Sequence, residues 1–67
     1  MIYENVQYLC KQQGISIAEC ERRAGLGNGV IAGWKTAAPR IDKLQAVANV
    51  LHVSLETIVG GLINETA

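Results

Sequence analysis

A chain of 67 residues has room for one hydrophobic core and no second domain, because a typical domain is about 100–150 residues long. Hydrophobic residues make up 49% of the chain and charged residues 18%, which excludes a disordered tail. The N-terminus lacks the basic and apolar regions of a signal peptide, and no apolar run approaches the roughly 20 residues that span a bilayer. We therefore expect a cytoplasmic protein with no membrane partner.

The formal net charge of zero conceals an uneven distribution of charge along the chain. Residues 20–43 carry five basic and two acidic side chains, a net charge of +3, whereas the remaining residues sum to −3. A basic middle on an acidic body would meet a polyanion from one side. The charges alone do not distinguish such a basic face from a chance distribution of solvated side chains.

Helical spacing of apolar residues predicts two helices in the first third of the chain. The first covers about residues 2–13, and Gly14 follows as its C-cap. The second opens at Ser16, where Ser16 and Glu19 fit a capping box in which hydroxyl and carboxylate each satisfy a free backbone N–H. Its buried stripe consists of Ile17, Cys20 and Ala24.

Two glycines in residues 25–27 predict a sharp turn, because glycine adopts the left-handed backbone that such a turn requires. A short third helix is then predicted over about residues 28–35, with Asn28 as its cap. Its inward-facing residues are Ile31 and Trp34. We interpret the tryptophan as part of the core rather than as a base-stacking residue. Residues 36–39 form a loop that ends at a proline.

The fourth predicted helix, over about residues 41–51, has the clearest amphipathic pattern in the chain. Its apolar stripe consists of Leu44, Val47, Ala48 and Leu51. Ser54 then caps a short fifth helix, which is predicted to end at Gly60 and Gly61. The inward-facing residues of the fifth helix are Leu55, Ile58 and Val59. No alternating pattern predicts a strand.

The sequence offers little for catalysis or for metal binding. The single histidine, His52, falls at the end of a predicted helix, where it favours a structural role over that of a catalytic base. Cys10 and Cys20 lie on different predicted helices without the spacing of a zinc site, and we interpret them as reduced apolar residues. The glycine-rich stretch at residues 25–29 lacks the context of a phosphate-binding loop. We therefore expect no enzyme activity, no metal ion and no cofactor.

The most informative pattern is residues 16–35, with a capped helix, a glycine-containing turn and a second short helix. Trp34, Pro39 and the stretch V-A-x-x-L-x-V-S-L at residues 47–55 follow in order. In this order and spacing the sequence resembles the Cro/C1-type helix-turn-helix family, also called the Xre family. The resemblance covers nearly the whole chain. It implies one all-α domain over residues 1–67, a five-helix lambda-repressor-like DNA-binding domain whose second and third helices form the helix-turn-helix.

The resemblance implies that the third helix lies in the DNA major groove. The base-facing set carried over onto this sequence is Asn28, Gly29, Val30 and Gly33. The Asn28 amide can pair with adenine through two hydrogen bonds, and Val30 can touch a thymine methyl group. Family members usually carry polar or basic residues where Ala32 and Gly33 stand. A helix face with so few polar side chains indicates one of two things. Either the protein recognises its DNA site through few base contacts together with DNA shape, or the domain binds protein partners instead of DNA.

The resemblance also places the start of the second helix against the DNA backbone, where helix amides and a hydroxyl can bind an anion. Cations and donors around the following loop would add to this contact. The expected phosphate-contacting residues are Ser16, Ile17, Lys35, Thr36, Arg40 and Lys43. For each of them, a solvated surface residue remains the alternative.

These expectations describe a sequence-specific regulator of bacterial or phage type that binds double-stranded DNA, with repression as the expected effect. The alternative is a protein-interaction module on the same fold, such as an antirepressor or antitoxin. We expect a homodimer, because the family reads paired half-sites, and place a possible dimerisation segment at residues 54–67. The expected interface residues are Ile58, Leu62 and Ile63. The alternative for Leu62 and Ile63 is that they pack against the core of their own protomer. No small-molecule ligand is evident.

Overall fold

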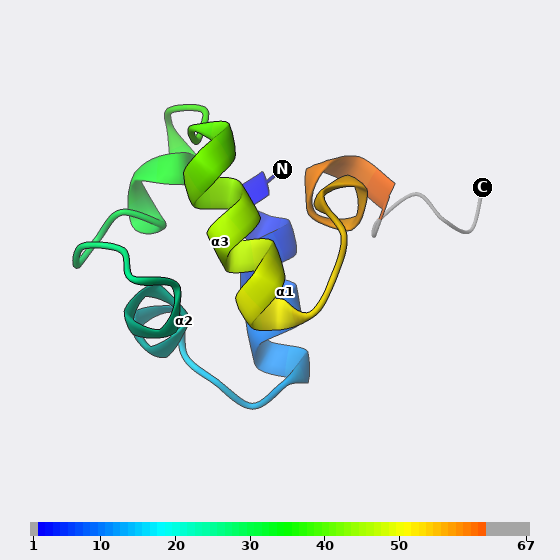
Figure 1. The fold of residues 1–67 in the computed structure, drawn as a ribbon, viewed down its shortest axis with the longest axis horizontal. Helices are drawn as coiled ribbons and strands as arrows, with labels where there is room; N and C mark the ends of the chain where they lie inside the picture. The colour runs from blue at the N-terminus through cyan, green and yellow to red at the C-terminus, as the bar shows by residue number, and fades with distance from the viewer. Residues whose placement is uncertain (1, 62–67) are drawn as a thin grey trace.

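The computed structural model describes residues 2–61, and every regular element within that range is helical. In chain order these are the α-helices α1 (Ile2–Gln12), α2 (Ile17–Ala24) and α3 (Ile41–Leu51), with the 3-10 helix η1 (Ala32–Lys35) before α3 and the π-helix η2 (Thr57–Gly61) after it. α2 packs against α3, and η2 packs against α1. In Figure 1, α2 and η2 lie on opposite sides of α3. No helix in the described range is long and apolar enough to cross a membrane.

One hydrophobic core joins all five elements or their flanking turns. Its members, all buried, are Val6, Leu9, Cys10, Cys20, Ile31, Leu44, Val47, Ala48, Leu51 and Ile58. The apolar stripe predicted for α3 is therefore confirmed. Trp34 is partly buried and packs against this core, as predicted. Burial of these side chains is the main favourable contribution to folding in a chain this small.

The ends of α2 are fixed by local hydrogen bonds. The Ser16 hydroxyl accepts a hydrogen bond of 2.9 Å from the Glu19 N–H, which confirms Ser16 as the N-cap. The second half of the predicted capping box is not formed, because the Glu19 carboxylate pairs with Arg22 and Arg23 instead. Gly25 ends the helix with a φ of +74°, and its N–H donates to the carbonyl of Arg22.

One side chain of α1 and one just after it bind backbone carbonyls far along the chain. The Gln13 amide, just after α1, donates to the Leu51 carbonyl at 2.7 Å, where α3 leaves its last carbonyls without helical partners. The fully buried Asn5 amide donates to the Ile58 carbonyl at 2.5 Å, across 53 positions in the sequence. These hydrogen bonds hold the C-terminal elements against α1.

The predicted third helix is shorter than expected and begins later. Residues 28–31 form successive turns, and helical structure begins only at Ala32, as η1. Gly29 has a φ of +87°, which lies outside the range of a right-handed helix, so helical backbone cannot pass through this residue. The five-helix expectation is thus met only in part, by three α-helices and two short elements of other geometry.

The predicted fifth helix also differs from expectation. The Ser54 hydroxyl accepts from the Thr57 N–H at 3.2 Å, but the following turn is π-helical and includes Gly60 and Gly61 rather than ending at them. Ile58 is fully buried, whereas Val59 is 50% exposed, so its predicted inward orientation is wrong. The predicted inward-facing set assumes the spacing of an α-helix. A π-helix has i→i+5 hydrogen bonds and therefore a different spacing, so Val59 points elsewhere. Leu62 and Ile63 lie outside the described residues.

α3 ends at His52, the one residue other than glycine with a positive φ among residues 2–61. Its φ of 59° is a left-handed conformation that strains an L-residue but suits glycine. We expect His52→Gly to raise the free energy of unfolding by about 0.5–1 kcal/mol, measured by urea denaturation. His52→Ala keeps the Cβ atom and should not stabilise the protein. Equal midpoints for the two variants would show that the strain is negligible.

Candidate nucleic-acid interface

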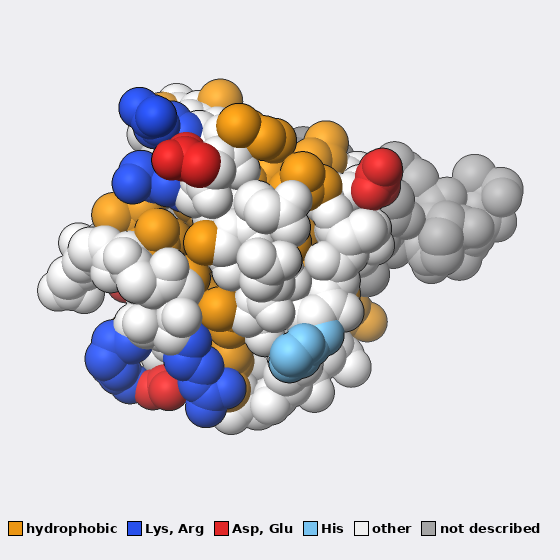
Figure 2. All heavy atoms as spheres, viewed as in Figure 1, with side chains coloured by type: hydrophobic (Ala, Val, Ile, Leu, Met, Phe, Trp, Pro, Cys, Tyr) orange, Lys and Arg blue, Asp and Glu red, His pale blue; other side chains and the backbone are white. Residues whose placement is uncertain are grey.

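The connection between α2 and η1, residues 25–31, lies at one edge of the molecule (Figure 1). Figure 2 shows lysine and arginine side chains gathered at this edge in two groups, each with an acidic side chain beside it, above and below a projection that is mostly uncharged. A polyanion approaching this edge meets both groups, which is the geometry expected for contact with the two strands bordering a DNA groove.

The four predicted base-facing residues come from this connection and from η1. Asn28, Gly29 and Gly33 are exposed, and Val30 is partly buried. A Cβ atom built on Gly33 would meet no atom within 4 Å, so the surface there is open. The exposed backbone of two glycines allows another molecule to approach this segment closely. Only Asn28 among the four offers side-chain hydrogen-bonding groups.

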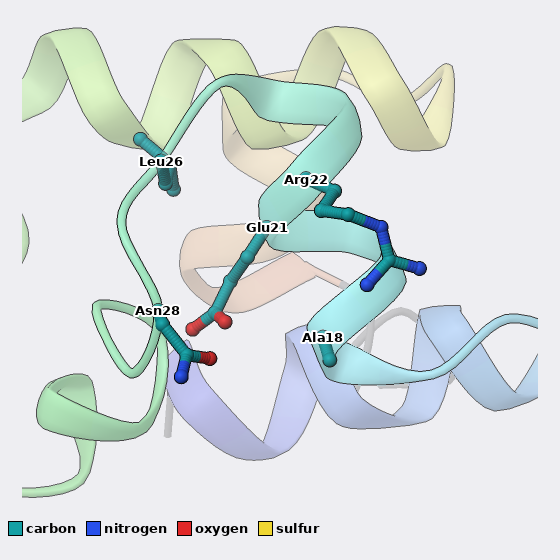
Figure 3. A pocket seen from close by; sticks show the side chains of 5 residues that line it. All are labelled: Ala18, Glu21, Arg22, Leu26 and Asn28. Carbon is teal, nitrogen blue, oxygen red and sulfur yellow. The ribbon is translucent and has the colours of Figure 1, made fainter.

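Asn28 borders a shallow depression of about 340 Å³ between α2 and the connection. Its lining residues are Ala18, Glu21, Arg22, Leu26 and Asn28. Figure 3 shows the Glu21 and Asn28 side chains pointing into the same space, from α2 and from the connection respectively, while Arg22 points away. The predicted base-reading amide is therefore next to a carboxylate of the preceding helix.

Glu21 is the residue at this site that sequence reasoning missed. Its side chain is only 4% exposed, and its two carboxylate oxygens accept hydrogen bonds from the N–H groups of Gly29, at 3.2 Å, and Ile31, at 2.9 Å. The available signal was its position on the buried stripe of α2, four residues after Ile17 and three before Ala24. An acidic residue at such a position needs hydrogen-bond donors inside the fold.

Ser16 and Ile17, the two residues predicted to contact phosphate at the start of α2, stand at its N-cap and at its first position. Ser16 is exposed at the N-cap, and its hydroxyl, which accepts from the Glu19 N–H, still has its own proton to donate. Ile17 is the first residue of the helix, and its side chain packs against the core, so only its backbone N–H is suited to an anion.

The four predicted contacts around the η1–α3 loop are partly engaged within the protein. The Lys35 ammonium lies 4.9 Å from the centroid of the Tyr3 ring, in a cation–π contact. The Thr36 hydroxyl donates to the Gly33 carbonyl at 3.4 Å. Arg40 Nε lies 3.3 Å from Asp42 Oδ1, and this contact lowers the pKa of the Asp42 carboxyl. Lys43 is partly buried.

Arg22 and Arg23 at the end of α2 are both exposed and both bind Glu19. Hydrogen bonds from Arg23 and Arg22 hold the pKa of the Glu19 carboxyl below its usual range. Such exposed ion pairs are screened by water and salt, so the two arginines still contribute to the positive field of this edge.

The two cysteines lie in the core as free thiols, away from this edge. Burial, together with the neighbouring Cys10 thiol, raises the pKa of Cys20 to about 12. Burial also raises the pKa of Cys10. Both thiols stay protonated at neutral pH and are unreactive as nucleophiles. Among residues 2–61 no three cysteine, histidine or acidic side chains are grouped so that they could hold a metal ion.

A family model described as "Helix-turn-helix" matches residues 6–58, from α1 to η2, and so includes α2, the connection and η1. No curated protein and no solved structure gives a significant match. The matched range covers most of the 67 residues and contains the capped helix, the turn and the exposed segment described above. The chain belongs to the Cro/C1-type helix-turn-helix family of DNA-binding transcription regulators.

Proposed function

We propose that this protein binds double-stranded DNA sequence-specifically and regulates transcription by repression, through occupancy of an operator. The observation that supports this most is the segment of residues 28–33, which is exposed except at Val30 and Ile31, lies between two groups of basic side chains and carries the Asn28 amide (Figure 2). η1 and the connection would enter the major groove, and the start of α2 would meet the backbone of one strand. Asn28 would pair with an adenine.

The experiment is a selection of bound sequences from random duplex DNA, followed by measurement of affinity at several salt concentrations. A DNA-binding protein releases counterions, so its affinity for the selected duplex falls steeply as salt rises. Enrichment of a common motif together with a steep salt dependence is the expected result. Absence of both would contradict the proposal.

A protein-interaction module on the same fold is the second candidate. Two observations favour it. Gly29, Ala32 and Gly33 have no side-chain hydrogen-bond donors for bases, and the Lys35 ammonium makes a cation–π contact with Tyr3 within the protein. An antirepressor or antitoxin of this kind would show no steep salt dependence toward duplex DNA. The same titration therefore separates the two functions.

Arg40 tests the phosphate contacts of the η1–α3 loop. It is exposed and stands immediately before α3, where a cation is unfavourable for the helix dipole. Its 3.3 Å contact with Asp42 is an exposed ion pair of little stability, which a DNA phosphate can replace. We expect Arg40→Ala to weaken binding to all duplexes alike and to lower the salt slope by about one. Lys11→Ala removes an exposed cation of α1, outside the basic residues 20–43, and serves as the control that should keep the wild-type slope. If Arg40→Ala keeps the wild-type slope, Arg40 makes no phosphate contact.

We further propose that the protein binds paired half-sites as a homodimer through its C-terminal segment. Ile58 is fully buried within the protomer, so Leu62 and Ile63 remain the proposed interface residues. We expect the double variant Leu62→Ser, Ile63→Ser to be a folded monomer, measured by light scattering together with thermal denaturation. An unchanged dimer with a lowered melting temperature would instead assign both residues to the protomer's core.

A further inference from the structure

We infer that Glu21 is a specificity-determining positioning residue, whose buried carboxylate fixes the backbone from which Asn28 meets a base pair. This inference rests on the proposed DNA-binding function. Glu21 itself contacts no base, because it is only 4% exposed and its oxygens face the protein backbone. It acts through the conformation of residues 28–31.

The two oxygens of one carboxylate bind both ends of a three-residue segment. Oε1 accepts from the Gly29 N–H and Oε2 from the Ile31 N–H. The backbone hydrogen bonds of this connection, such as that from the Val30 N–H to the Gly27 carbonyl, use neither of these two groups. Hydrogen bonds to a charged acceptor are stronger than those between neutral groups. Glu21 therefore fixes residues 29–31 relative to the rigid helix α2.

Asn28 immediately precedes this segment and borders the same depression as Glu21 (Figure 3). Its amide would need correct placement to form two hydrogen bonds with one base, since a bidentate contact tolerates little displacement. Residue 28 lies in turns and not in a regular helix, so helical hydrogen bonds do not hold its backbone. The contacts of Glu21 with residues 29 and 31 supply that restraint.

The charge of Glu21 is held by the backbone, because the neighbouring cations are engaged elsewhere. Arg22 and Arg23 both bind the Glu19 carboxylate, and no ion pair to Glu21 is found among the described side chains. This arrangement gives two opposite expectations for removing the charge. If Glu21 acted on DNA only through its field, neutralising it would strengthen binding, because it would repel phosphates less. If it positions the turn, neutralising it weakens selective binding.

The test compares Glu21→Gln with Glu19→Gln, two variants that each remove one negative charge from α2. Binding is measured to the selected duplex and to a duplex changed at the base pair where Asn28→Ala loses preference. We expect Glu21→Gln to reduce the preference between the two duplexes by about tenfold, within the range that one bidentate contact supplies. Glu19→Gln should keep that preference and bind both duplexes as well as or better than wild type.

A second readout, free of DNA, follows the backbone itself. In Glu21→Gln the side chain keeps one oxygen that can accept a hydrogen bond. Its NH₂ group replaces the second oxygen and faces a backbone N–H, so one of the two hydrogen bonds is lost. We expect the amide protons of Gly29 and Ile31 to shift in NMR spectra and to exchange faster with solvent, while those of α3 stay protected. Glu21→Ala should show a larger change in the same direction. If it does not fold, Glu21→Gln alone decides the question.

The outcomes separate the inference from the function on which it rests. If wild type distinguishes the two duplexes and Glu21→Gln retains the full preference, the inference is overturned and the DNA-binding proposal stands. An equal loss of affinity for both duplexes, parallel to a loss of thermal stability, would also overturn it, because the role would be general stabilisation. If wild type binds no duplex, the proposed function fails and the specificity role fails with it. The amide exchange rates would then still report whether Glu21 orders the connection.

Discussion

Ile31→Ala is expected to lower the free energy of unfolding by about 2–5 kcal/mol, the largest loss from any single change proposed for this protein. Ile31 is completely buried, with 0% of its surface accessible, and it is among the largest side chains of the core. Truncation removes apolar contacts and leaves a cavity between η1 and the other helices. A domain this small has a modest stability, so the variant should be substantially unfolded at room temperature.

Ile41 provides a matched control, since it is the same residue type and is 68% exposed at the start of α3. Ile41→Ala should change the free energy of unfolding by no more than about 0.5 kcal/mol. Both values come from urea denaturation followed by circular dichroism. Similar losses for the two variants would mean that Ile31 is not the apolar anchor of η1.

Asn28→Ala is expected to lower binding to the selected duplex by about 1–3 kcal/mol, with the loss confined to one base pair. Among the base-facing candidates, only Asn28 has a side chain with both a donor and an acceptor. The folded structure should be unaffected, because the residue is exposed and lies in a turn. The measurement is a titration against duplexes that carry each of the four base pairs at every position of the site.

Asn49→Ala is the control for this variant. Asn49 is also exposed, but it lies on α3 and its side chain accepts a hydrogen bond from Gln45 at 2.9 Å. We expect this variant to keep both the affinity and the base preferences of wild type. If Asn28→Ala behaves in the same way, residues 28–33 do not face the bases and the proposed orientation on DNA is wrong.

The α-helices could be predicted from the sequence because their signals are local. In α3 the apolar stripe sets the boundaries, and the predicted range agrees with the observed Ile41–Leu51. At α2, Ser16 identifies the first turn through a side chain that acts three residues away. Such signals depend on neighbours within one or two helical turns, which the sequence displays directly.

The candidate site was less predictable because its conformation depends on a longer-range contact. The helical spacing of Ile31 and Trp34 indicated a regular helix, but Gly29 interrupts it with a positive φ. Glu21 stabilises the resulting turns from eight and ten residues away, and no local pattern encodes that pairing. The predicted reciprocal contact of Glu19 failed for a different, local reason, because Arg22 and Arg23 lie on the same helix face and compete for its carboxylate.

The hydrogen bond from Asn5 to the Ile58 carbonyl has a consequence for how the chain folds during synthesis. A buried amide without an acceptor is costly, so α1 cannot settle into its final packing before residue 58 is available. On the ribosome, we expect the first helix to reach its final packing only after nearly the entire domain has emerged. We expect a nascent chain stalled before residue 58 to remain sensitive to protease, and the domain to fold in one late step after its last elements leave the exit tunnel.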